Sequence, residues 1–432
     1  MTVAGFCLPY LLAYFLQTLY GLADLYIIGQ FNGVESTTAV SIGSQVMHML
    51  TVMVVGLSMG STVTIGQAVG GDKKEEAALS IGNTVTLFLA VALAAMCFLQ
   101  ALTKPVVSLM STPPEAVAAT QRYLMICFAG IPFITAYNVI SSVFRGLGDS
   151  RSPMVFVALA CACNIVLDYV FIGALRLGAA GAALGTTLSQ SLSVLFAFYS
   201  LRRQETGIRL SRRHFRPDRG KMKDLLAIGV PIALQDGFIQ ISFIAVTVLA
   251  NRRGLTDAAS VGIVEKLITF IFLVPSSLLS TVSALGAQNL GAGKPDRARK
   301  VFFLCAASAA LWGILAVLFM AFFRQPVIGL FTSDPEVVRR GSEYMSSYVL
   351  DTITAGIHFC FSGYFCALGK SYLSFVHNAA SILLLRLPVA YIASVRFPDT
   401  LFPMGLAPLS GSTLSVLLCA FFYIRLSRGC RH

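Results

Sequence analysis

Residues 86–103 read TLFLAVALAAMCFLQALT, and the thiol of Cys97 is the one ionisable side chain among them. Residues 301–323 read VFFLCAASAALWGILAVLFMAFF, again with a single ionisable group, the thiol of Cys305. Each stretch approaches the roughly 20 apolar residues that cross a lipid bilayer as an α-helix. We therefore expect a polytopic membrane protein.

The composition of the whole chain points the same way. Of its 432 residues, 56% are apolar and 12% are Asp, Glu, Lys or Arg. A soluble domain usually carries about 25% charged residues, so this chain cannot coat a soluble surface of the expected size. This balance excludes soluble enzymes, disordered proteins, coiled coils and secreted disulfide scaffolds.

Charged or Pro/Gly-rich breaks divide the chain into twelve apolar segments. They lie near residues 4–30, 37–69, 78–103, 119–144, 153–174, 180–201, 225–250, 259–290, 301–323, 341–367, 372–395 and 403–425. We expect helices rather than a β-barrel, because the runs are long and apolar and are not alternations of about ten residues. We expect no cleavable signal peptide, because Met1 leads almost directly into the first span without a basic region before it.

The net charge of +12 is distributed unevenly along the chain. With a cytoplasmic N-terminus, the inner segments hold 21 basic residues and the outer segments hold nine. The positive-inside rule then predicts a protein of the plasma (inner) membrane with both termini in the cytoplasm. The basic run Arg202–Lys223 could also indicate nucleic acid or anionic lipid. We interpret it as a cytoplasmic linker and expect membrane lipid, but no nucleic acid, as a partner.

The ten cysteines lie mostly within apolar spans, with no CxxC pair and no histidine at metal-ligand spacing. We expect them to be small buried hydrophobic residues. A membrane-embedded enzyme would need a nucleophile–base pair or a metal motif such as HExxH, and neither appears in the sequence. We therefore predict neither an enzymatic activity nor a cofactor.

The second half of the chain repeats the first. A shift of 221 residues aligns Pro105, Leu109, Pro114, Glu115 and Tyr123 with Pro326, Leu330, Pro335, Glu336 and Tyr344. The same shift aligns Gln67, Gly70 and Lys73 with Gln288, Gly291 and Lys294, and Leu147, Gly148 and Ser150 with Leu368, Gly369 and Ser371. Scattered identities are common in apolar sequence, but one shift shared over such a distance indicates that six spans were duplicated.

Because six is even, both halves run through the membrane in the same direction. They are therefore expected to be related by a pseudo-two-fold axis along the membrane normal. We predict an N-terminal six-helix lobe (residues 1–205), a basic cytoplasmic linker (206–222) and a C-terminal six-helix lobe (223–432). Two lobes around a central cleft suit a carrier with alternating access better than a channel, which more often surrounds its pore with identical subunits.

Several motifs resemble a known family. They are Pro9 with Gly21-Leu-Ala-Asp24-Leu-Tyr-Ile-Ile-Gly29, Arg145-Gly-Leu-Gly-Asp149, Asn164-Ile-Val-Leu-Asp168 and Gln288-Asn-Leu-Gly-Ala-Gly293. Together they resemble the multidrug and toxic compound extrusion (MATE) transporters of prokaryotes. The resemblance implies a V-shaped antiporter of twelve helices that exports organic cations and other amphiphiles in exchange for H⁺ or Na⁺. Members usually carry a short cytoplasmic lead before the first span, whereas this sequence begins almost inside it.

Acidic residues inside the spans are the strongest candidates for functional residues, since a charge at the bilayer centre costs about 2.5–3.5 kcal/mol on insertion scales. Asp24 lies late in span 1 and Asp168 late in span 5, so both are expected at similar depth in the outer half. Asn164 and Tyr20 each lie one helical turn before one of these acids, and Thr186 lies early in span 6. The family resemblance implies the same roles for Asp24, Asn164 and Asp168.

These oxygen-bearing side chains predict a site that binds H⁺ or Na⁺, and two neighbouring acids favour H⁺. The alternative is a hydrogen-bonded polar cluster that only joins helices. At the duplicated positions the second half has Val246, Leu385 and Val389. We therefore predict one coupling site per chain.

The second half has intramembrane acids of its own: Asp236 in span 7, Glu265 in span 8 and Asp351 in span 10. We predict that they line the cleft and attract a cationic or amphiphilic substrate. Glu265 could instead form an ion pair with Lys266. Asp236 could instead lie at the membrane interface. Pro9 removes a backbone hydrogen bond and is expected to kink span 1, unless it is an early-helix proline that the helix tolerates.

The sequence thus predicts a monomeric drug or metabolite antiporter whose two lobes rock about a central site. A rival hypothesis is a flippase for lipid-linked molecules, but a pyrophosphate substrate would require a cation-lined cleft, whereas the predicted cleft residues are mainly acidic. A receptor or a purely structural protein is a weaker hypothesis, because the halves are duplicated. For the loop Arg145–Asp149 we favour a structural role in a tight turn.

Overall fold

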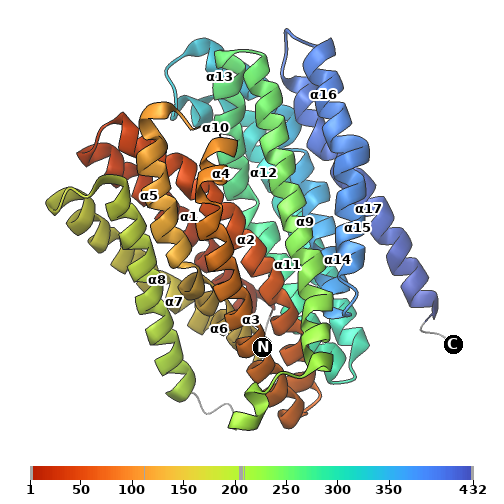
Figure 1. The fold of residues 1–432 in the computed structure, drawn as a ribbon. Helices are drawn as coiled ribbons and strands as arrows, with labels where there is room; N and C mark the ends of the chain where they lie inside the picture. Colours follow the sequence, from red (N-terminus) through yellow and green to blue (C-terminus); the bar gives the residue numbers. More distant parts are fainter. Residues whose placement is uncertain (1–2, 111, 204–207, 209, 430–432) are drawn as a thin grey trace. The chain divides into compact units, whose positions relative to one another are not determined.

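The computed structural model describes residues 3–110, 112–203, 208 and 210–429, and all regular structure in these residues is helical (Figure 1). The chain separates into two compact units, Met1–Gly229 and Val230–His432. The expected all-helical fold of two lobes is confirmed. The boundaries at residues 205 and 222 stay predictions, and residues 206, 207 and 209 of the linker lie outside the described residues.

The N-terminal unit is built from eight helices with short helical turns between them. These are α1 (Val3–Phe31), α2 (Val34–Gly70), α3 (Lys74–Ala101), α4 (Thr103–Leu109), the 3₁₀ turn η1 (Pro114–Ala116), α5 (Val117–Ala129), α6 (Ile131–Gly146), α7 (Arg151–Asp168), the π-helical turn η2 (Tyr169–Ala174), α8 (Gly178–Arg203) and the 3₁₀ turn η3 (Arg212–Phe215). Helix α9 (Arg219–Arg252) begins in this unit and continues into the next.

The C-terminal unit continues with a similar series. Its elements are α10 (Leu255–Ile271), α11 (Leu273–Gly291), α12 (Pro295–Gly329), α13 (Pro335–Tyr348), α14 (Asp351–Ala367), α15 (Tyr372–Ser381), the π-helical turn η4 (Ile382–Arg386), α16 (Leu387–Arg396) and α17 (Phe402–Gly429).

Ten helical segments among the described residues are long and apolar enough to cross a membrane. The pair α5–α6, bent by 45° at Gly130, makes an eleventh span if it is counted as one. The remaining expected span, residues 341–367, is formed by α13 and α14. Charged residues in α13 lower its hydropathy, so composition alone does not mark this span, but the helices are consistent with the expected count of twelve.

The duplication is visible in the helix boundaries. Helix α2 spans residues 34–70, and α10 with α11 spans residues 255–291, which is the same interval shifted by 221. The bend between α5 and α6 also has a counterpart, because α13 and α14 are separated at Val349–Leu350. The halves differ in their π-helical turns, which fall at residues 169–174 and 382–386 and therefore not at equivalent positions.

Apolar side chains pack inside each unit and also cover its outside. Buried cores include Ile28, Leu124 and Phe128 in the N-terminal unit. Large apolar side chains such as those of Phe98 and Phe322 are exposed instead. Exposed apolar surface of this extent is expected for a protein whose solvent is lipid.

The segment that follows α8 is anchored to the N-terminal unit. The side-chain amide of Asn83 in α3 donates to the carbonyl of His214 (3.3 Å) and accepts from the backbone N–H of Asp218 (2.7 Å). Glu75 lies beside the side chains of Arg213 and His214 at 2.5 and 3.1 Å. The hydrogen bond with His214 is the main cause that lowers the pKa of Glu75 below its ordinary value, and Arg213 adds to it. The ionised Glu75 carboxylate therefore stabilises the folded protein at neutral pH. This stabilisation is lost as the pH falls through the lowered pKa.

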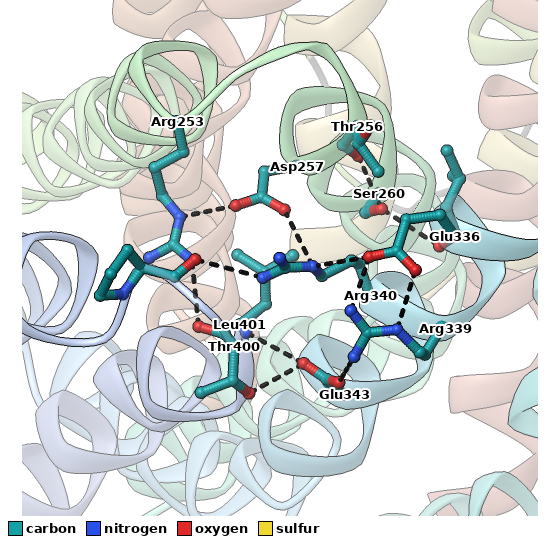
Figure 2. Close-up of polar contacts among 12 residues, drawn as sticks. Arg253, Thr256, Asp257, Ser260, Glu336, Arg339, Arg340, Glu343, Thr400 and Leu401 are labelled. Carbon is teal, nitrogen blue, oxygen red and sulfur yellow. Dashed lines mark hydrogen bonds and ion pairs between the residues drawn. The ribbon is translucent and has the colours of Figure 1, made fainter.

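A polar network joins the connection between α9 and α10, helix α13 and the loop between α16 and α17 (Figure 2). The guanidinium of Arg253 pairs with Asp257 at 2.7 Å, and the side chains of both residues are only 7% exposed. Arg253 also donates to backbone carbonyls between α16 and α17, among them that of Pro398 (2.9 Å). Glu343 in α13 accepts from the hydroxyl of Thr400 (2.8 Å). The network fixes α9, α10, α13 and α17 to one another with charge-assisted hydrogen bonds.

We predict that Asp257→Ala destabilises the protein by about 3 kcal/mol, because it leaves the buried Arg253 guanidinium without its charge partner. The matched control is Asp296→Ala, which removes an ion pair with Arg299 whose carboxylate is 86% exposed. It is expected to cost less than about 1 kcal/mol. Thermal unfolding of both variants in detergent measures the difference, and equal melting temperatures would contradict the role of the buried pair.

Candidate functional site

The carboxyl groups of Asp24 and Asp168 meet inside the N-terminal unit. Asp24 on α1 accepts a hydrogen bond from the hydroxyl of Thr186 on α8 at 3.3 Å. Asn164 on α7 lies one turn before Asp168, and its amide lies 3.5 Å from the Asp168 carboxylate. The two carboxyl groups lie close enough to interact electrostatically with each other. Asp24, Asn164 and Asp168 are at most 4% exposed, so three helices converge on a buried acidic cluster.

This acidic cluster contains more acceptor oxygens than donors. One carboxylate oxygen of Asp24, one of Asp168 and the amide oxygen of Asn164 are buried without a hydrogen-bond partner. Unpaired buried acceptors are costly, and a bound cation or proton would satisfy them. The described residues contain no group of three or more His, Cys, Asp or Glu that could hold a metal ion.

The local chain geometry explains why α8 can approach the acids. A Cβ atom on Gly185 would collide with a carboxylate oxygen of Asp168, so glycine leaves the space that this side chain occupies. The π-helical turn Tyr169–Ala174 begins directly after Asp168. Such turns are rare and frequently lie at functional sites. Gly185 precedes Thr186 in the sequence, but nothing in the sequence alone distinguished it from the other glycines of span 6.

Three further side chains border the acidic cluster. Tyr20, one of the predicted residues, is half-buried and lies beside both Asp24 and Thr186. Tyr123 and Cys127 on α5 are buried and lie near Asp24, and the sequence did not indicate either of them. The structure therefore brings together all five residues predicted for ion coupling.

The acids of the C-terminal unit are arranged differently, around an arginine. Arg386, the last residue of η4, lies close enough to interact electrostatically with both Glu265 and Asp351. Its guanidinium donates to the hydroxyl of Tyr348 at 3.3 Å and lies 4.6 Å from the centre of the Phe243 ring. Glu265 accepts from Thr247 (3.2 Å), and its second oxygen is buried without a partner.

The third acid predicted for the cleft lies elsewhere in this unit. Asp236 on α9 is near Cys366 on α14, and no described contact joins it to Glu265 or Asp351. The buried pair His358 and His377 packs ring to ring with centroids 5.6 Å apart. His377 also contacts the hydroxyls of Ser362 on α14 and Ser415 on α17.

The positions equivalent to Asp24 and Asp168 carry apolar side chains in the second half. Val246 is buried in the apolar core of the C-terminal unit, and Val389 packs against this core. Pro9 lies in the second turn of α1 and is buried, and the helix continues through it from Val3 to Phe31. Whether this proline kinks α1 during function stays a prediction.

The sequence profile of the MatE family matches residues 9–170 and again residues 231–392, once in each half. The chain belongs to the MatE family. These are the MATE transporters that the motifs resemble, so the protein is a multi-pass membrane transporter and not an enzyme. Transporters of this family work without a bound cofactor.

Curated relatives cover nearly the whole chain. It is 28% identical over 427 residues to the probable multidrug resistance protein YpnP of Bacillus subtilis, covering 98% of this chain and 94% of the relative. It is 26% identical over 385 residues to the FAD transporter of Shewanella oneidensis, covering 87% and 84%. It is 23% identical over 400 residues to the multidrug export protein MepA of Staphylococcus aureus, covering 91% and 86%.

Solved structures share the fold. A crystal structure of MATE in complex with MaL6 matches with a TM-score of 0.93 at 22% identity, covering 100% of this chain and 97% of the other. The outward-facing conformation of a multidrug resistance MATE family transporter matches with a TM-score of 0.92 at 22% identity, covering 100% and 96%.

We predict that Gly185→Ala displaces Asp168 and destabilises the protein by about 1–3 kcal/mol, because the added methyl group overpacks the acidic cluster. The matched control is Gly21→Ala on α1, where a Cβ atom would meet nothing within 4 Å. Melting temperatures in detergent compare the two variants. If Gly185→Ala is as stable as the control, the close approach of α8 to Asp168 does not depend on glycine at position 185.

Proposed function

We propose that this protein is a secondary active antiporter that exports organic cations or amphiphilic drugs and metabolites in exchange for H⁺. Membership of the MatE family supports a transporter, and relatives named as multidrug resistance and multidrug export proteins support the substrate class. In this proposal two lobes rock to expose the substrate to each side in turn. We further propose that the protein acts as a monomer in the plasma (inner) membrane and that both of its termini lie in the cytoplasm.

The observation that supports the proposal is that Asp24 and Asp168 lie close together in a buried site, each with one carboxylate oxygen that has no hydrogen-bond partner. Two carboxylates in a dry interior repel each other, and a proton shared between them removes this repulsion. Release of that proton on one side of the membrane and its capture on the other is the step that antiport needs. Na⁺ is the alternative, because carboxylate, amide and hydroxyl oxygens can also bind this cation. We favour H⁺ because the cluster has two acids close together.

For substrate recognition we propose Glu265, Asp351 and Asp236 of the C-terminal unit. Glu265 has a buried carboxylate oxygen without a partner, which a cationic substrate could pair with. Arg386 lies near both Glu265 and Asp351 and balances their charge when no substrate is bound. Because Val246 and Val389 replace the acids of the N-terminal cluster, we propose that the C-terminal unit binds substrate and that the N-terminal unit binds the coupling ion.

We predict that Asp24→Asn and Asp168→Asn each reduce H⁺-driven exchange at least tenfold, because an amide cannot bind and release the coupling proton. Proteoliposomes loaded with a fluorescent organic cation such as ethidium measure the exchange under a pH gradient or a Na⁺ gradient, applied separately. Glu35→Gln is the control, since Glu35 is exposed at the start of α2.

Undiminished exchange in both variants would remove the coupling role of the acidic cluster. Transport by the wild type under the Na⁺ gradient alone would instead identify Na⁺ as the coupling ion.

We predict that Glu265→Gln weakens binding of ethidium about tenfold, equivalent to about 1.4 kcal/mol, while the protein still responds to a pH gradient. The reason is that the variant loses the buried negative charge but keeps the size of the side chain. Fluorescence titration of the purified protein measures the affinity, and Glu115→Gln, at an exposed position, is the control. Unchanged affinity would contradict the assignment of Glu265 to substrate.

A further inference from the structure

A second polar site lies inside the N-terminal unit, where α6 ends and α7 begins. It is a small cavity of about 20 Å³. Its polar lining comes from α1, α6 and the start of α7: Tyr10, Tyr14, Gln17, Tyr137, Arg145 and Ser150. The volume corresponds to about one water molecule or one ion of similar size.

Arg145 is the cation that lines this cavity, and no ion pair joins it to an acid among the residues that the structure describes. Arg145 is only 9% exposed, and its Nε–H is buried without a hydrogen-bond acceptor. Its one described side-chain contact is with the ring of Tyr10, whose centre lies 5.4 Å from the guanidinium carbon. The carboxylate of Asp149 accepts instead from the backbone N–H of Arg151 and from the hydroxyl of Ser152. A buried charge needs a partner of opposite sign.

The other polar lining groups are neutral and can donate hydrogen bonds as well as accept them. The hydroxyl of Ser150 is buried without a hydrogen-bond partner, and no carboxylate lines the cavity. Tyr10 and Tyr137 are buried phenols, and a phenol can donate its O–H. The end of α6 compensates part of the arginine charge through its helix dipole, and the Tyr10 ring compensates another part. Neither accepts the unpaired N–H of Arg145.

We propose that this cavity binds a compact monovalent anion of the size of chloride, held by the guanidinium of Arg145 and the hydroxyl of Ser150. The anion completes the hydrogen bonds of both groups and neutralises the buried charge. Tyr10, Tyr14 and Gln17 place the site on the same helix as Asp24, with Gln17 about 10 Å along α1 from it at 1.5 Å per residue. The site is separate from the acidic cluster, and its test does not depend on transport.

The test measures thermal unfolding of the purified full-length protein in detergent at constant ionic strength, with chloride, acetate, sulfate or gluconate as the sodium salt. A thiol-reactive dye reports unfolding, because most of the described cysteines are buried. Chloride is expected to raise the melting temperature of the wild type saturably by about 3 °C relative to gluconate. If acetate also raises the melting temperature, the site binds carboxylate groups as well as chloride.

Arg145→Gln is expected to abolish the chloride response, and Ser150→Ala to shift its midpoint at least threefold to higher chloride. Arg122→Gln is the matched control, because this arginine is exposed on α5, and it is expected to respond like the wild type. An unchanged response in Arg145→Gln, or equal melting temperatures in all four salts, would overturn the proposal.

A second measurement covers the case in which Arg145→Gln does not fold. Crystals of the wild type grown in bromide are expected to show an anomalous scattering peak beside Arg145 and Ser150. No peak in this cavity would overturn the proposal.

Discussion

The absence of water from the bilayer interior is the constraint on which the rest of this structure depends. Every carboxylate carried into that interior needs a partner from the protein or from a bound ion. In the N-terminal unit, α1, α7 and α8 bring two carboxyl groups together and supply only one hydroxyl and one amide to them. Buried acceptor oxygens in this cluster are therefore left without donors.

The same helical scaffold serves a different chemistry in each half. Helix boundaries repeat with a shift of 221 residues, yet the acids on α1 and α7 have apolar counterparts in the second half. There, Arg386 lies among Glu265, Asp351 and Tyr348 instead. The π-helical turns also lie at different positions in the two halves. One such turn follows Asp168 directly and the other ends at Arg386.

Much of the fold could be predicted from the sequence, because hydropathy over a span depends on composition and not on packing. The long apolar runs, the duplication and the family motifs all follow from local order along the chain. The break between α13 and α14 at Val349–Leu350 was not predicted, since no proline or glycine in the sequence marks it. The convergence of Asp24, Asn164 and Asp168 was predicted from their depth and helical spacing, whereas Tyr123, Cys127 and Gly185 were not.

The sequence by itself therefore determined that the chain is a duplicated, all-helical membrane transporter and which helices carry ionisable groups. The tertiary structure alone decided which of those groups meet. It placed Asp24 near Asp168, placed Arg386 near Glu265 and Asp351 but not near Asp236, and buried the Nε–H of Arg145 without an acceptor among the described residues. The reason is that a sequence fixes the face of a helix on which a side chain lies, whereas the rotation and tilt of that helix against its neighbours depend on packing along its whole length.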